Sequence, residues 1–172
     1  MRYCGIGKSG FDSAVSGAGG GSRWWEYNVR EPFIKMLPTN MAASIGLAQL
    51  DRIDALQARR KEIWATYQRE LATIPGLVSP VEAELGDRHS YFTYCIRVPK
   101  RDELARYLLG RQIYTTLRYH PLHLCALYGQ TEVRLPNSEE LNETALSIPI
   151  HPRMSEADVW SVISEIRKFF RV

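Results

Sequence analysis

The chain has 172 residues, of which 45% are hydrophobic and 24% are charged, and its net charge is +3. This length suits one domain, and the hydrophobic content is sufficient for a core. The basic residues are spread along the chain and often stand beside acidic ones, so the sequence lacks the clustered basic surface of a nucleic-acid-binding protein. No apolar run approaches the roughly 18 residues of a membrane span. We therefore expect neither nucleic acid nor a membrane as a partner.

The three cysteines, Cys4, Cys95 and Cys125, are far apart in the sequence. They form neither a Cys-x-x-Cys pair nor an even-numbered disulfide framework, which favours a reducing compartment. The first residues also lack the apolar segment of a signal peptide. We therefore expect a cytoplasmic location.

Residues 1–37 show no sustained helical or strand periodicity. Residues 17–22 read GAGGGS, a composition typical of a flexible loop. Trp24 and Trp25 stand beside Tyr27 and predict a short extended piece. We expect the two indole rings to be covered by core or interface packing, with contact to a ligand as the alternative. The segment is predicted to be an irregular connection.

The segment from Pro38 to Pro75 predicts one long helix, because its apolar residues recur mostly at steps of three, four or seven. Thr39 or Asn40 can cap its start, and Pro75 ends it. Small residues around Gly46 suggest that another backbone packs closely there. The charged residues of the second half predict a solvated face: Arg59, Arg60, Lys61, Glu62, Arg69 and Glu70.

The rest of the chain predicts a small sheet covered by helices. The expected strands are 91–98, 113–117 and 146–150, where β-branched and aromatic residues gather. Between the first two lies an expected helix at 102–111, an order that is consistent with a crossover unit. A short helix at 138–145 has Ser138 as its expected cap and Leu141 facing inward, and a capping box at Ser155 opens the last helix. We therefore predict an α/β or α+β fold, with residues 38–172 forming the long helix and a small domain.

Residues 118–124 are dense in polar and aromatic groups. His120 and His123 are three residues apart, but no third ligand is near enough in sequence to indicate a metal site. We expect a turn in which His and Tyr side chains bond to the backbone, with ligand contact as the alternative. The chain has no glycine-rich phosphate loop after a strand and no G-x-S-x-G motif. The residues by themselves therefore indicate no enzyme, no catalytic group and no metal.

Several segments, taken in order, resemble one family. They resemble the C-terminal half of the PLP-dependent nucleotide-sugar aminotransferases of the DegT/DnrJ/StrS type. The AAxIGLxQL pattern and the LSxPIHP pattern before the last helix are the most specific of them. The matching segments are 24–27, 42–54, 59–60 with Tyr67, 89–91, 113–116, 121–123, 135–138 and 146–152.

The resemblance implies the small domain of a fold-type I enzyme, which is normally a homodimer and transfers an amino group from glutamate to a keto-sugar on a nucleotide. In this family the Schiff-base lysine lies in the large domain, upstream of the segment that this chain matches. No lysine of this chain has that sequence context: Lys8, Lys35, Lys61, Lys100 and Lys168. We therefore expect no transamination by this chain alone. The large PLP domain is expected on another chain, or to have been lost by truncation.

The resemblance also suggests site residues. Lys35 and Asn40 lie near the family position that reaches the phosphate of PLP in the partner subunit. His89, Arg118, Tyr119 and His120 match positions near the substrate mouth, where a guanidinium suits a diphosphate.

By analogy, the implied pathway is the synthesis of a surface polysaccharide or of a deoxysugar. The alternative is a stand-alone, non-catalytic module that binds a partner or a nucleotide sugar.

Overall fold

The computed structural model describes residues 38–117, 119–128 and 132–172. The chain divides into two units, Met1–Gln49 and Leu50–Val172. The predicted connecting segment, with its two tryptophans, lies outside the described residues, so its character and its boundary stay predictions. Over the described ranges, no helix is both long enough and apolar enough to cross a bilayer.

The segment predicted as one long helix forms two. Helix α2 spans Asn40–Leu50 and helix α3 spans Ile53–Leu71, with a turn at Asp51 and Arg52. The prediction of an uninterrupted helix is therefore wrong at this turn. A carboxylate is favourable in the first turn of a helix, and Asp54 occupies the first turn of α3, so its charge suits the start of a second helix here.

Helix α2 lies in the first unit except for its last residue, Leu50, and it has no buried residue. Of its two candidate caps, Thr39 is the one whose side chain accepts a hydrogen bond, from the backbone N–H of Ala42 at 3.1 Å. A methyl group placed on Gly46 would meet no described atom within 4 Å. The close packing that the small residues predict is therefore not seen among the described residues of this unit, and it stays a prediction.

The second unit is built on a small sheet. Strand β1 (Tyr94–Arg97) pairs antiparallel with strand β2 (Ala145–Ile148), with Cys95 opposite Ser147. All four residues of β2 are buried, whereas β1 alternates between buried and more exposed positions. Strand β2 pairs with β1 along one edge, and its Ser147 also forms an isolated bridge with Thr116.

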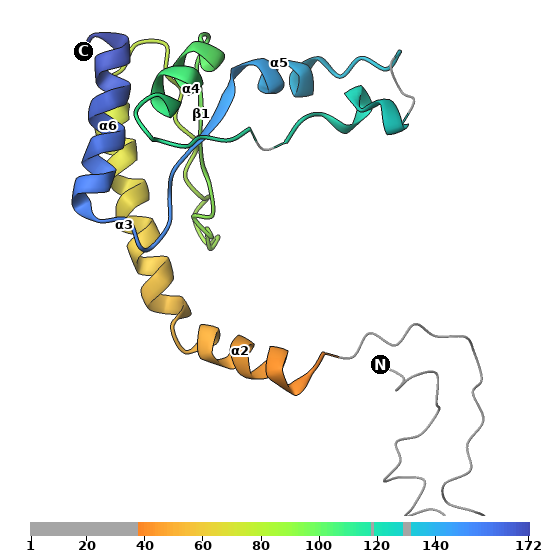
Figure 1. The fold of residues 1–172 in the computed structure, drawn as a ribbon, viewed down its shortest axis with the longest axis vertical. Coiled ribbons are helices and arrows are strands. Elements are labelled where there is room, and N and C mark those ends of the chain that lie inside the picture. The colour runs from red at the N-terminus through yellow and green to blue at the C-terminus, as the bar shows by residue number, and fades with distance from the viewer. Residues whose placement is uncertain (1–37, 118, 129–131) are drawn as a thin grey trace, which may run out of the picture. The chain divides into compact units, whose positions relative to one another are not determined.

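Helices complete the core of this unit. Helices α4 (Arg101–Leu109) and α6 (Glu156–Phe170) pack on each other, and α6 also packs beside α3 (Figure 1). Together with the sheet they confirm the predicted mixed fold of a small sheet covered by helices. The largest fully buried side chains come from all of these elements: Ile63, Tyr67, Leu71, Tyr94, Ile96, Val98, Leu104, Leu108, Val159, Ile163 and Ile166.

Isolated bridges widen the sheet on both sides. Val78 pairs with Arg97 of β1, and Thr116 pairs with Ser147 of β2, both antiparallel. The segment at Thr116 and β1 therefore both oppose β2 and run parallel to each other, as expected for the crossover through α4. The predicted third strand, 113–117, is a single bridge here, so the described part has two strands rather than three.

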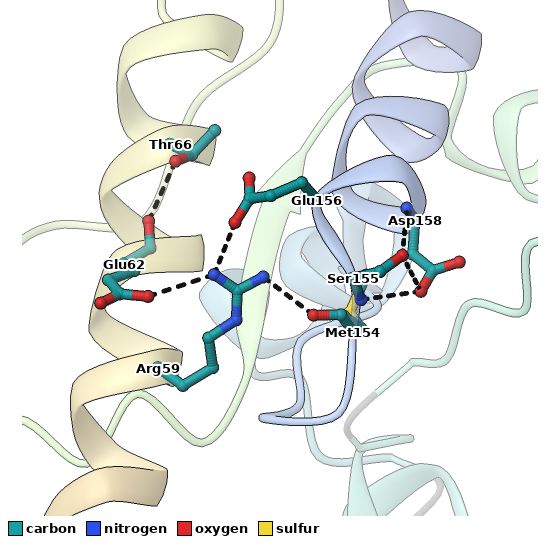
Figure 2. Close-up of polar contacts among 7 residues, drawn as sticks. All are labelled: Arg59, Glu62, Thr66, Met154, Ser155, Glu156 and Asp158. Atoms are coloured by element: carbon teal, nitrogen blue, oxygen red, sulfur yellow. Dashed lines mark hydrogen bonds and ion pairs between the residues drawn. The ribbon is translucent and has the colours of Figure 1, made fainter.

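One arginine joins α3 to the start of α6. Arg59 donates to Glu62 at 3.1 Å, to Glu156 at 2.7 Å and to the backbone carbonyl of Met154 at 2.8 Å (Figure 2). Its side chain is 23% exposed, so the prediction of a solvated face is wrong for Arg59. The planar guanidinium can satisfy several acceptors in fixed directions, and Arg59 thereby ties two helices that are distant in sequence.

Helix α5 (Pro136–Thr144) differs from the helix predicted at 138–145. It begins with proline at its first turn and has no side-chain cap, so Ser138 is not the cap. Leu141 is 44% exposed rather than inward-facing. The helix lies beside the segment of two short 3₁₀ helices, η2 (Leu122–Leu124) and η3 (Ala126–Tyr128) (Figure 1).

Candidate functional site

The described substrate candidates fall into two polar regions of the second unit. His89 lies against α3, whereas Tyr119 and His120 lie in the segment beside α5. Arg118 and Lys35 lie outside the described residues, and Asn40 belongs to the other unit.

His89 is held between aromatic rings. Its ring centroid lies 4.6 Å from that of Trp64 and 4.6 Å from that of Tyr91. Its Nδ1 accepts a hydrogen bond from the backbone N–H of Tyr91 at 2.8 Å. An accepting Nδ1 belongs to the neutral imidazole whose proton is on Nε2, so Nε2 is available as a donor.

The loop that carries His89 makes a further hydrogen bond to α3 and contains an unusual backbone conformation. The indole N–H of Trp64 donates to Glu82 at 2.6 Å. Tyr91 has a φ of 48°, an uncommon backbone conformation for a residue other than glycine. The hydrogen bond to His89 helps to hold this turn, so imidazole orientation and loop conformation depend on each other.

A cavity of about 300 Å³ opens beside His89. Its charged lining balances two basic side chains, Lys61 and Arg88, against two acidic ones, Asp54 and Asp87. Arg88 is engaged with Asp54 at 3.2 Å. The arrangement therefore suits a polar group that both donates and accepts hydrogen bonds rather than a simple anion.

In the second region, two imidazoles contact side chains of α5. His120 Nδ1 lies 3.2 Å from Asn142 Oδ1, and His123 Nε2 lies 3.3 Å from Glu139 Oε1. His123 is 8% exposed and Tyr119 is 76% exposed. These contacts correct the expectation that the histidines bond to the backbone of a turn, because each imidazole bonds to a side chain of another element.

Glu139 is the centre of this second region. Besides His123, it accepts hydrogen bonds from Arg134 Nε, at 2.9 and 3.0 Å, and from the backbone N–H of Leu135 at 2.9 Å. Arg134 and the Leu135 N–H together lower the pKa of Glu139 to about 2. The carboxylate is therefore charged throughout the physiological range, and it presents that charge to His123.

A larger cavity of about 590 Å³ lies at the side of the sheet where Thr116 bridges to Ser147. Ser147 is 7% exposed, and its Oγ has no hydrogen-bond partner among the described residues. His151, Asp158 and Ser161 also line the cavity. No sequence motif indicated this space, because its lining comes from segments that are distant in the chain.

The described residues do not fit as the site that holds PLP. A Schiff-base lysine is activated by desolvation in an enclosed pocket. Lys61 is exposed, Lys100 lies 3.4 Å from Glu103, and Lys168 lies 2.6 Å from Glu165. The described ranges also hold no group of three or more His, Cys, Asp or Glu side chains arranged to bind a metal.

Asn40 is the described candidate for contact with the cofactor. It is the first residue of α2, it is exposed, and its backbone carbonyl accepts a hydrogen bond from the Ser44 hydroxyl at 2.9 Å. Its side chain has no hydrogen-bond partner among the described residues. The position is compatible with an anion contact at a helix N-terminus, and this role stays a prediction, as does that of Lys35.

Comparison with known proteins gives a consistent result. The model of the DegT/DnrJ/EryC1/StrS aminotransferase family matches residues 16–167. A dTDP-4-dehydro-2,3,6-trideoxy-D-glucose 4-aminotransferase from Saccharopolyspora spinosa is 34% identical over 162 residues, which are 93% of this chain and 41% of that protein.

Solved structures agree with the sequence comparison. The aminotransferase TlmJ from Streptoalloteichus hindustanus is 40% identical with a TM-score of 0.79, over 86% of this chain and 41% of its own. A structure described as the PLP form of the sugar aminotransferase Spr1654 from Streptococcus pneumoniae is 26% identical with a TM-score of 0.78, over 86% of this chain and 39% of its own. The chain thus spans about two-fifths of the length of each of these relatives.

Proposed function

Because the chain belongs to the DegT/DnrJ/EryC1/StrS aminotransferase family, we propose that it forms the C-terminal part of a PLP-dependent aminotransferase. The reaction moves an amino group, from glutamate, to a nucleotide-linked keto-sugar. The observation that carries this proposal is the family match over residues 16–167, combined with coverage of only two-fifths of the relatives. The relative from S. spinosa, which is named for a dTDP-linked keto-sugar, supports this substrate class.

In this proposal the chain supplies contacts rather than the central chemistry. PLP supplies the electron sink for amino transfer, and a large domain outside the matched segment supplies the lysine that holds it. His89, Arg118, Tyr119 and His120 contact the nucleotide sugar, while Lys35 and Asn40 approach the phosphate of the cofactor. The exposure of Tyr119 and the available Nε2 of His89 support the substrate roles.

The active assembly is proposed to be a homodimer of complete subunits. The widely spaced cysteines favour the cytoplasm as its compartment. The relatives support a pathway that makes a surface polysaccharide or a deoxysugar. The spore coat polysaccharide biosynthesis protein SpsC from Bacillus subtilis, 34% identical over 83% of this chain and 39% of that protein, supports the first of these pathways.

The proposal is tested by complementation. The chain is mixed with the separately produced remainder of the S. spinosa relative, and amino transfer from glutamate to the dTDP-linked keto-sugar of that enzyme is followed. We expect activity in the mixture and none from either part alone. Reduction with borohydride in the presence of PLP should give no specific lysine adduct on the isolated chain. A single stoichiometric adduct would show that this chain holds the cofactor itself.

The alternative is a non-catalytic module that binds a partner or a nucleotide sugar. The exposed apolar side chains of α2 fit this alternative as well as they fit an aminotransferase part, because in either role another protein would cover them. They are Met41, Ile45, Leu47 and Leu50, which are 60–76% exposed. Failure of the two parts to associate, with nucleotide-sugar binding retained by the chain alone, would support the module.

A further inference from the structure

The segment that carries Tyr119 and His120 is attached to α5 through a matched pair of contacts. His120 and His123 are three residues apart in the segment, and their partners Asn142 and Glu139 are three residues apart on the helix. Residues at i and i+3 lie on the same face of a helix. One face of α5 therefore receives both imidazoles, in antiparallel order.

The two contacts differ in kind. His123 is buried, and its partner Glu139 is itself held by Arg134 and by the backbone N–H of Leu135. His120 is exposed, as is its contact with Asn142. The first contact therefore anchors the segment, and the second orients the side chain nearest to Tyr119.

Helix α5 is in turn fixed to the rest of the unit. Arg101 at the start of α4 donates to the backbone carbonyl of Asn142 at 2.6 Å. The helix continues without a break into β2, the buried strand of the sheet. Through α5, the imidazoles are therefore connected to the core of the unit rather than to a free loop.

We propose that Glu139 and Asn142 are positioning residues, which hold the segment containing Tyr119 and His120 in the geometry that binds the nucleotide sugar. This inference rests on the proposed function, because it assigns α5 a role in the same site. Neither residue need touch the substrate. Their effect is to reduce the conformational freedom that substrate binding must otherwise restrict.

The first arm of the test measures the contact itself. Hydrogen exchange is followed at the amides of Leu124, Cys125 and Tyr128, which are bonded within this segment. Glu139→Gln removes the charge facing His123 and should speed their exchange by roughly tenfold. Glu140→Gln is the matched control and should leave the rates unchanged. It makes the same chemical change one residue away, at a side chain with no hydrogen bond or ion pair to the described residues of the segment. Unaltered exchange in β1 and β2 shows that the variants are folded.

The second arm measures the role in binding. In the complemented enzyme, Glu139→Gln and Asn142→Ala should raise KM for the dTDP-linked keto-sugar by about three- to tenfold, with little change in kcat or in KM for glutamate. A merely structural loss would reduce activity toward both substrates together. Wild-type exchange rates in Glu139→Gln, or KM values equal to those of the Glu140→Gln control, would overturn the inference while leaving the proposed function intact. A mixture that is inactive with the wild-type chain would instead overturn the proposed function and the positioning role with it.

Discussion

The last two helices of the chain are held in opposite ways. Helix α6 begins at a capping box and buries four apolar side chains, whereas α5 has no side-chain cap and buries none. Helix α5 is placed instead by polar contacts, with Arg101 of α4 and with the imidazoles of His120 and His123. The comparison separates two roles: α6 stabilises the core, and α5 positions a candidate binding segment.

The largest difference is expected from truncating one apolar side chain in each helix. Ile163 of α6 is fully buried, so Ile163→Ala should lower the free energy of unfolding by about 2–5 kcal/mol through lost burial and a cavity. Leu141 of α5 is 44% exposed, so Leu141→Ala should lower the free energy of unfolding by less than about 1 kcal/mol. Urea unfolding of both variants measures the difference. Equal losses would show that α5 also contributes to the core.

A smaller effect is expected at the junction of α3 and α6. Arg59→Ala removes the donor that serves Glu156 and the carbonyl of Met154, and should lower the free energy of unfolding by roughly 1–2 kcal/mol after allowance for the exposed carboxylates. Arg106→Ala, on the exposed surface of α4, is the control and should change it little. An Arg59→Ala variant as stable as the control would mean that water replaces these contacts without cost.

The caps give a third and more modest contrast. The Ser155 hydroxyl accepts a hydrogen bond from the N–H of Asp158 at 3.2 Å, and the Asp158 carboxylate accepts one from the Ser155 N–H at 2.8 Å. Ser155→Ala should therefore lower the free energy of unfolding by about 1 kcal/mol. Ser138 lies inside the first turn of α5 and caps nothing. Ser138→Ala should therefore leave the thermal midpoint nearly unchanged, and a loss equal to that of Ser155→Ala would contradict the assigned start of α5.

The smallest effect is a dependence on pH that arises from α5. The pKa of Glu139 is about 2 in the folded chain, against an ordinary value of 4.5. A lowered folded pKa means that the charged carboxylate stabilises the fold above about pH 4.5 and that this contribution is lost as the pH falls toward 2. Urea midpoints at pH 5, 4 and 3 should fall more steeply for the wild type than for Glu139→Gln. Parallel slopes would show that Arg134 does not hold the carboxylate in solution.

Part of this difference between helices could be read from sequence. The serine followed three residues later by aspartate predicted the cap of α6, because a capping box depends on residues close together in the chain. Helix α5 has no side-chain cap, and its predicted cap and inward leucine were both wrong. The division of the first long helix at Asp51 was likewise missed, since apolar periodicity continues across the turn.

In the candidate site, too, the sequence predicted some residues and missed others. Sequence resemblance pointed to His89, Tyr119 and His120, but not to Glu139 or Asn142, whose importance depends on a contact across some twenty residues. The matching three-residue spacings are visible in the sequence only once the segments are known to lie side by side.

The sequence by itself determined the family, the mixed fold, the helices with apolar faces and the capping box, because these follow from local spacing and motif order. Only the tertiary structure decided that Arg59 joins two helices, that the third strand is reduced to one bridge, and that α5 receives two imidazoles. These features depend on which distant segments meet in space, and burial of the common core decides that meeting rather than any local preference.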